Sequence, residues 1–138
     1  MSNARFVRLD WTGEGLRFRG SGVDPHTPSI TLDGSTEEGP TPMDALLLAT
    51  AGCAGADVVS ILKKMKVGLE TVSIDVVGER RTEHPKRYVG LKYVFRFAGD
   101  GLERAQAERA VSLSLEKYCS VLFSLNPDIQ VDHEIELL

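Results

Sequence analysis

The sequence predicts an α+β fold in which a mainly antiparallel sheet surrounds one long buried helix. Residues 39–65 form a single run that is apolar around too much of its circumference for a one-sided surface helix. Other stretches alternate apolar and polar residues, as strands do. Turn residues join these strands directly, which favours hairpins over βαβ units. The expected order is three strands, a helix, two strands, a helix and a strand.

Size and charge limit what such a fold can do. With 138 residues, 42% of them hydrophobic and 26% charged, the chain is expected to form one domain, residues 1–138. A net charge of −4 and a pI near 5.4 argue against nucleic acid or an anionic membrane surface as a partner. The apolar runs look too short to span a membrane, and residues 1–5 lead into a strand pattern without a signal-peptide core. We therefore expect a cytoplasmic protein.

The long helix has recognisable ends. Thr41 can cap its N-terminus, and Pro42 fits the first helical position. Gly68 is expected to stop it, after a last turn rich in cations that suit the helix dipole, namely Lys63, Lys64 and Lys66. A domain this small cannot cover a helix that is apolar on so many faces. We infer that a second copy of the chain covers it, in a homodimer.

The first part of the chain is expected to form three strands. Residues 6–11 and 16–19 alternate on either side of a glycine-containing turn and predict a hairpin. Residues 20–28 contain two glycines and two prolines, so they predict an irregular loop. A short strand at 29–33 and a second loop at 34–40 then lead into the long helix.

The second part is expected to add a hairpin, a helix and a last strand. Residues 69–79 and 87–97 alternate cleanly and predict a hairpin with one buried face. Residues 102–118 carry apolar residues at helical spacing, and 129–137 alternate as a strand. If the helical pitch continues, Cys119 falls on the apolar stripe of this second helix.

The two cysteines are the main candidates for chemistry. Cys53 and Cys119 are too few for a disulfide scaffold and lack the spacing of a thioredoxin motif or a zinc knuckle. Cys53 lies midway along the long helix near Gly52 and Gly55. Because glycine is unfavourable inside a helix, the two glycines predict that the backbone of another element packs closely against this part of the helix and contacts the thiol. The alternative reading is that both cysteines are small buried hydrophobic residues.

A reactive Cys53 thiolate would need a cation from elsewhere. It lies about three turns from the start of its helix, beyond the reach of the dipole, and Asp57 one turn later disfavours a second negative charge nearby. Glu37 or Glu38 could hold an arginine against the thiolate. The candidate cations are Arg17, Arg19, Arg80 and Arg81.

Metal and cofactor sites are not indicated. His26, His84 and His133 lack the spacing of a metal-binding helix, and no phosphate-binding or dinucleotide motif occurs. Residues 80–87 form a basic cluster between two strands, read as a solvated hairpin tip or, alternatively, an anion clamp. We expect neither a cofactor nor a metal.

Two motifs resemble the OsmC/Ohr family of thiol peroxidases. They are residues 39–62, GPTPMDALLLATAGC followed by AGADVVSIL, and residues 109–121, RAVSLSLEKYCSV. The order of strands and helices is similar along essentially the whole chain. The resemblance implies an intertwined homodimer with active sites at the subunit interface, in which Cys53 is the peroxidatic cysteine and Cys119 the resolving one.

The resemblance also implies a reaction. A Cys53 thiolate would reduce an organic hydroperoxide and become a sulfenic acid, which Cys119 would convert to a disulfide; a dithiol, in this family a lipoyl group, would reset it. Arg19 is the best match to the family's activating arginine, ahead of Arg17, with Glu38 as a candidate partner; Met43 stands where the family has a glutamate. The competing hypotheses are a non-catalytic, dimeric small-molecule-binding or stress protein and a thiol enzyme acting on another electrophile.

Overall fold

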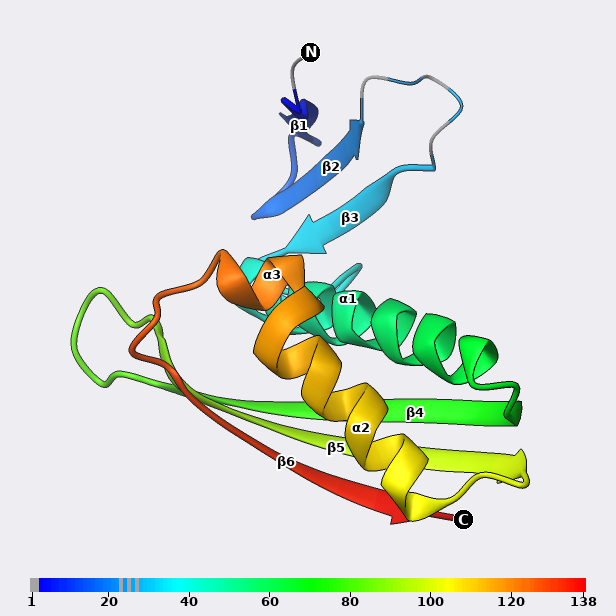
Figure 1. Cartoon of the computed structure of the whole chain (residues 1–138). Helices are drawn as coiled ribbons and strands as arrows, with labels where there is room; N and C mark the ends of the chain where they lie inside the picture. Colours follow the sequence, from blue (N-terminus) through cyan, green and yellow to red (C-terminus); the bar gives the residue numbers. More distant parts are fainter. Residues whose placement is uncertain (1–2, 23, 25, 27) are drawn as a thin grey trace. The chain divides into compact units, whose positions relative to one another are not determined.

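The structure, a computed structural model, describes residues 3–22, 24, 26 and 28–138 (Figure 1). It divides into two compact units, Met1–Leu46 and Leu47–Leu138. That the chain forms one domain stays a prediction. Two sequence-based predictions fall partly outside the described residues. They concern the N-terminal residues 1–2 and positions 23, 25 and 27 of the predicted loop.

The N-terminal unit contains a three-stranded antiparallel sheet in the order β1-β2-β3. The predicted hairpin is confirmed, but the second strand continues to Gly22, so the prediction of a loop beginning at residue 20 is wrong. Gly20 pairs with Leu9, and a Cβ at Gly20 would lie only 3.1 Å from a Leu9 methyl carbon. The glycine therefore lets the strands stay paired beneath a large side chain. The strands are β1 Val7–Trp11, β2 Arg17–Gly22 and β3 Ile30–Asp33.

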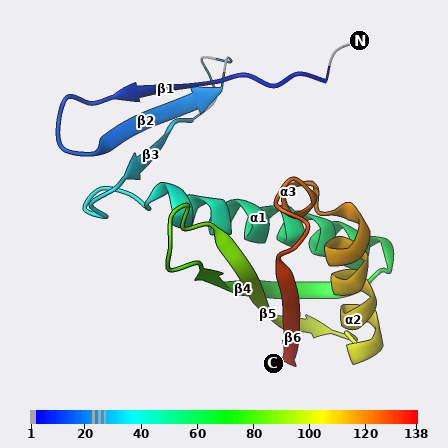
Figure 2. The same ribbon diagram turned by 90° about the vertical axis from the view of Figure 1, so that its left-hand side faces the viewer.

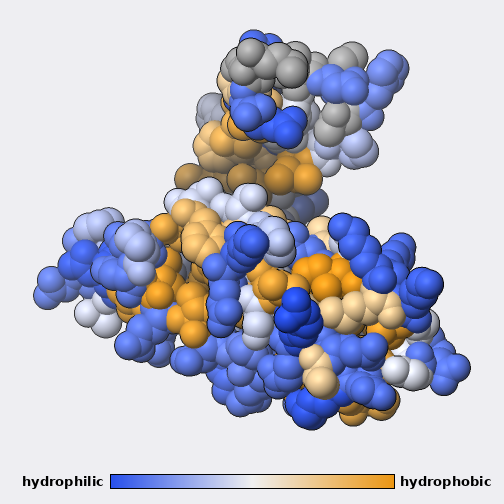
Figure 3. Space-filling view, in the orientation of Figure 1, coloured by the Kyte–Doolittle hydropathy of each residue, from blue (hydrophilic) through white to orange (hydrophobic). Residues whose placement is uncertain are grey.

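The two faces of this sheet differ in chemistry. Residues paired directly across antiparallel strands share a face, and the register therefore gathers six apolar side chains on one side: Val7, Leu9, Trp11, Phe18, Ile30 and Leu32. Val7 is 77% exposed and Trp11 60%. Figure 3 shows hydrophobic atoms on the surface of this unit. The opposite face carries Arg17, Arg19 and Asp33.

The long helix is α1, Pro42–Lys64, and its start is as predicted. The Thr41 hydroxyl accepts a hydrogen bond from the Asp44 backbone N–H at 3.1 Å. Its end differs from the prediction at Gly68. Lys66 takes a left-handed conformation with φ of 62°, and the Lys66 and Val67 N–H groups bond back to the carbonyls of the last turn. Gly68 instead begins the next strand.

Only one face of α1 is buried within the chain. The fully buried residues repeat every four positions: Thr50, Ala54, Val58 and Leu62. Leu48, on another face, is 61% exposed. By length and composition alone α1 could cross a membrane, contrary to the expectation that every apolar run is too short, although the core helix of a soluble protein passes the same test.

The C-terminal unit is built on a second three-stranded sheet, in the order β4-β5-β6. The predicted hairpin of β4, Gly68–Arg80, and β5, Tyr88–Asp100, is confirmed. However, β6, Gln130–Leu137, runs parallel to β5, so the prediction of hairpins throughout is wrong. The helical segment between β5 and β6 carries the chain back along the sheet, as in a βαβ crossover.

Helices and sheet enclose the core of this unit. In Figures 1 and 2, α1 and α2, Arg104–Leu113, lie on the same side of the sheet. Beneath them, β5 presents a row of buried side chains: Leu91, Tyr93, Phe95 and Phe97. The three aromatic rings stack, with centroids 5.9 Å apart for Tyr93 and Phe95 and 6.1 Å apart for Phe95 and Phe97. Tyr93 of this row contacts Thr50 of α1, one turn before Cys53.

The predicted second helix changes pitch near its end. After α2, residues Ser114–Tyr118 form a π-helical turn, η1, in which the Cys119 N–H donates to the Ser114 carbonyl at 2.8 Å. Cys119 is extended, with φ −71° and ψ 94°, before the short helix α3, Ser120–Phe123. The prediction that Cys119 continues the regular α-helical pitch is therefore wrong, because the π-helical turn contains one residue more than an α-helical turn. Cys119 is nonetheless fully buried.

Candidate thiol site

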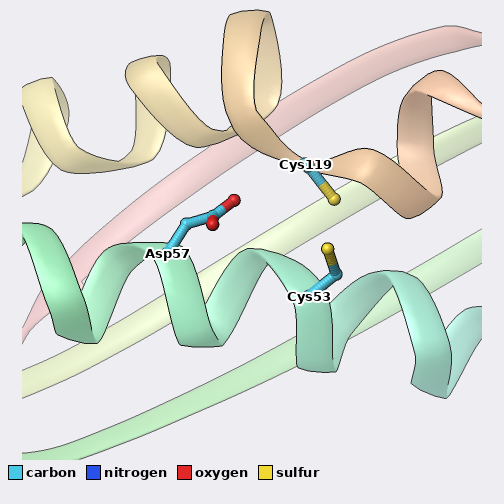
Figure 4. Close-up of side chains that lie close together, drawn as sticks. All are labelled: Cys53, Asp57 and Cys119. Atoms are coloured by element: carbon cyan, nitrogen blue, oxygen red, sulfur yellow. The ribbon is translucent and has the colours of Figure 1, made fainter. Parts of the chain in front are cut away.

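The two cysteines lie close together in the C-terminal unit. Cys53 is half-buried on α1, whereas Cys119 is fully buried between η1 and α3. Their sulfur atoms lie within 4.8 Å of each other and point toward one another (Figure 4). Both are free thiols. Because a disulfide requires an S–S separation of about 2 Å, a shift of at most about 3 Å would join them.

The glycines of α1 are not what brings a partner to Cys53. A Cβ at Gly55 would lie 3.1 Å from the Ile74 side chain of β4, and at Gly52 no atom of the described residues lies within 4 Å of that position. The prediction that a second backbone packs on these glycines is therefore wrong for the described residues of the chain itself. The π turn brings the partner instead, because it displaces Cys119 from the helix and turns it toward α1.

Thr50 forms the inner wall of the site, and sequence analysis missed it. Its hydroxyl lies 2.6 Å from the Tyr93 hydroxyl and 3.9 Å from the Cys119 sulfur. The Cys119 thiol also lies 3.9 Å from the Thr50 carbonyl, toward which it donates. Helical spacing was the available signal, because Thr50 precedes Cys53 by three residues and so shares its face of α1.

The environment keeps Cys119 protonated. Burial raises the pKa of the Cys119 thiol above its usual value, and the neighbouring Cys53 raises it further. The Leu122 backbone N–H and the Thr50 hydroxyl act in the opposite direction. Burial likewise raises the pKa of Tyr93, so its hydroxyl stays neutral beside Thr50. Cys119 is thus suited to reacting as a thiol that loses its proton only when attacking another sulfur.

Asp57 is the third group at the site. It lies one turn after Cys53, and a carboxylate oxygen is within 4.8 Å of both sulfurs (Figure 4). The Ser114 hydroxyl, fully buried, donates a hydrogen bond to Asp57 at 2.9 Å. Among the described residues Asp57 has no ion pair with a basic side chain. The carboxylate is thus held in place by the Ser114 hydroxyl.

Arg17 is part of a charge cluster in the N-terminal unit. Its guanidinium contacts Asp33 at 3.2 Å, Glu37 at 3.1 Å and Glu14 at 3.4 Å. The Glu38 backbone N–H donates to Asp33 at 3.2 Å. Hydrogen bonds from the Ser35 N–H and then from Arg17 hold the pKa of the Asp33 carboxyl below its usual value.

The other predicted activating residues remain predictions. Arg19 is exposed on the same sheet face as Arg17, in the N-terminal unit, whereas Cys53 lies in the C-terminal unit. Glu38 belongs to the N-terminal unit as well. Arg80 donates to the Lys86 carbonyl at 2.6 Å, within the hairpin connection between β4 and β5.

A match to a protein family covers both cysteines. The family model described as OsmC-like protein matches residues 34–134. The chain belongs to the OsmC-like family. Protein YhfA of Escherichia coli K12 is 36% identical over 133 residues, which cover 96% of this chain and 97% of that protein. The OsmC-like fold is a fold of soluble proteins.

Solved structures agree with this OsmC-like assignment. A hypothetical protein from Aquifex aeolicus VF5 is 32% identical, with a TM-score of 0.83 and 99% of each chain covered. A protein from Legionella pneumophila described as organic hydroperoxide resistance protein OsmC is 16% identical, with a TM-score of 0.65 and 96% of each chain covered. The second likeness shows a shared fold. The predicted fold class and family are thereby confirmed.

Proposed function

We propose that this OsmC-like protein is a thiol-dependent peroxidase that reduces organic hydroperoxides in defence against oxidative stress. The observation that carries the proposal is the pair of free sulfurs within 4.8 Å, one half-buried and one fully buried. The half-buried thiol can meet a substrate, and the buried thiol can meet only its neighbour. This asymmetry supports the peroxidatic role that we propose for Cys53 and the resolving role that we propose for Cys119.

The first step oxidises Cys53. Its thiolate attacks the distal oxygen of the hydroperoxide, a sulfur–oxygen bond forms and the oxygen–oxygen bond breaks. The alkoxide leaves and takes up a proton to become an alcohol, while the sulfur becomes a sulfenic acid. The peroxide is thereby reduced by two electrons that the cysteine supplies.

The second step joins the two cysteines. Cys119 attacks the Cys53 sulfur, the disulfide forms, and the sulfenic hydroxyl leaves as water with the proton that Cys119 gives up. A dithiol, for which we propose a lipoyl group, then reduces the disulfide by exchange and is itself oxidised to a disulfide. The cycle therefore needs no bound cofactor.

Activation of Cys53 is assigned to a cation from β2. We propose Arg19, with Arg17 as the second candidate and Glu38 as a carboxylate that holds the arginine. Arg17 already contacts three carboxylates, including Glu37, which suits it to organising this part of the chain. Arg19 is exposed and available to a substrate-binding surface.

We further propose that the functional form is a cytoplasmic homodimer. The apolar face of the β1-β2-β3 sheet leaves large side chains exposed, a pattern typical of an interaction surface: Val7, Leu9, Trp11 and Ile30. α1 also exposes Leu48. A second copy would cover both, and the mass of the protein in solution, measured by light scattering, tests this directly.

The peroxidase proposal is tested by consumption of an organic hydroperoxide, such as cumene hydroperoxide, in the presence of a dithiol. The wild-type chain is expected to consume it catalytically, and Cys53→Ser to lose the activity entirely. The competing function, non-catalytic binding of a small molecule, predicts no consumption by either chain. Circular dichroism of the variant shows whether it still folds.

A further inference from the structure

The cluster around the two thiols also has the composition of a metal site. Cys53 and Asp57 lie one turn apart on α1, and Cys119 faces them from the junction of η1 and α3 (Figure 4). One ligand atom from each lies within 4.8 Å of the others. We propose that the reduced protein binds a thiophilic divalent cation, such as Zn²⁺, through the Cys53 and Cys119 sulfurs and an Asp57 carboxylate oxygen.

The spacing of the three atoms suits a tetrahedral ion. Zinc binds thiolate sulfur at about 2.3 Å and carboxylate oxygen at about 2.0 to 2.2 Å, so its ligand atoms lie roughly 3.5 to 4 Å apart. The atoms here lie within 4.8 Å, and an adjustment of about 1 Å brings them to that separation. Cys53 and Asp57 are only half-buried, which leaves their side chains room to adjust.

Neighbouring groups already hold the ligands in place. The fully buried Ser114 hydroxyl donates to Asp57 at 2.9 Å, and this fixes the orientation of the carboxylate. Hydrogen bonds of this kind to ligating carboxylates are a regular feature of metal sites. The Thr50 carbonyl, 3.9 Å from the Cys119 sulfur, limits where that thiol can turn. The site thus has supports beyond its three ligands.

Charge and access favour a particular class of ion. Two thiolates select zinc, cadmium or copper(I) over magnesium and calcium, which prefer all-oxygen sites. Binding releases one proton from each thiol, and a water molecule completes the four ligands. Asp57 also lines an open cleft of about 500 Å³ with Ser60, Ile61 and Tyr118, so this one of the three ligands is reached from solvent.

Metal binding and thiol oxidation exclude each other. Formation of the disulfide joins the two sulfurs and removes both thiolate ligands, so the oxidised chain has no site. Conversely, a bound ion occupies the electron pair with which Cys53 would attack a peroxide. The metal would therefore inhibit the proposed peroxidase, a consequence that rests on that function, whereas the binding itself does not.

The test is a titration of the full-length protein after reduction and removal of metal with a chelator. Binding of Cd²⁺ is measured by the thiolate-to-metal charge-transfer absorption. Binding of Zn²⁺ is measured by competition with a colorimetric chelator. We expect one ion per chain and no binding by the disulfide form. Cys53→Ser should abolish the charge-transfer band of the paired thiolates. Asp57→Asn, which still accepts the Ser114 hydrogen bond, should weaken binding by about tenfold or more, because even groups that only orient ligands contribute about 10- to 100-fold.

Matched variants make the result decisive. Ser114→Ala should weaken binding in the same direction, while Asp44→Asn, an exposed change on the same helix, should leave it unchanged. Absence of binding by the reduced wild-type chain overturns the proposal, as does binding that Asp57→Asn leaves intact. Both readouts are independent of peroxide consumption, so an inactive chain that binds the ion contradicts only the proposed function.

Discussion

The hydroxyl groups of Thr50 and Tyr93 lie 2.6 Å apart in the core of the C-terminal unit, directly beneath the thiol site. This contact joins α1 to β5, and both side chains are fully buried. It therefore fixes the face of α1 that presents Cys53 and Asp57. The thiol site consequently depends on a polar contact inside an otherwise apolar core.

Tyr93→Phe is expected to destabilise the fold by about 1 to 3 kcal/mol, because it leaves the buried Thr50 hydroxyl without its partner. Urea unfolding followed by circular dichroism measures the change. The matched control is Tyr118→Phe, an exposed position, where we expect about 0.5 kcal/mol or less. Equal stabilities for the two variants would contradict the role given to this contact.

The two thiols should differ in their reaction with an alkylating agent. Because burial raises the pKa of Cys119, its alkylation in the folded, reduced and metal-free chain should require a pH above the ordinary value for cysteine, about 8.5. Cys53, which is half-buried, should be alkylated before Cys119. Peptide mass spectrometry assigns each site, with the urea-unfolded chain as the reference. Faster labelling of Cys119 would rule out this arrangement.

The Arg17–Asp33 pair should make stability depend on pH. Hydrogen bonds from the Ser35 N–H and then from Arg17 lower the pKa of Asp33 in the folded chain, so ionised Asp33 stabilises the fold. That contribution to stability is complete at pH values above the ordinary carboxyl pKa of about 4. It is lost as the pH falls through the lower pKa that Asp33 has in the folded chain.

Asp33→Asn should therefore melt at a lower temperature than the wild type near neutral pH, with the difference shrinking in acid. Asp10→Asn, an exposed change in the same sheet, serves as the control. A difference that persists unchanged at low pH would mean that ionisation of Asp33 is not its source.

Arg17 and Arg19 should respond differently to replacement by alanine. Arg17→Ala removes contacts to three carboxylates and should lower the melting temperature. Arg19→Ala should leave stability nearly unchanged and slow the reaction with an organic hydroperoxide by about tenfold or more, as loss of an electrostatic contact in the transition state does. Stopped-flow kinetics and thermal unfolding separate the two effects. The reverse pattern would transfer the activating role to Arg17.

The elements that the sequence predicted best are those set by local pattern. Alternation in β4 and β5, and the Thr41–Pro42 start of α1, depend on neighbouring residues alone. The parallel placement of β6 was missed because alternation is the same in parallel and antiparallel strands. The end of α1 was missed because a lysine, Lys66, takes the left-handed position usual for glycine.

The site was predictable in its cysteines and less so in its surroundings. Family resemblance indicated the pairing of Cys53 with Cys119, whereas the π turn that presents Cys119 has no pattern in the residues we could recognise. Thr50 and Ser114 are buried polar residues on otherwise apolar helix faces, and their roles arise only when α1 and η1 come together. Helical spacing from Cys53 could have pointed to Thr50, which the sequence analysis missed, but not to the partner that Thr50 would meet.

The most direct test of the account is to treat the reduced, metal-free chain with one equivalent of an organic hydroperoxide and map its cysteines by mass spectrometry. The account predicts an alcohol product, loss of both free thiols and a single peptide pair linked through Cys53 and Cys119. Unreacted hydroperoxide, or a Cys53 oxidised to sulfinic acid while Cys119 remains a free thiol, would contradict it.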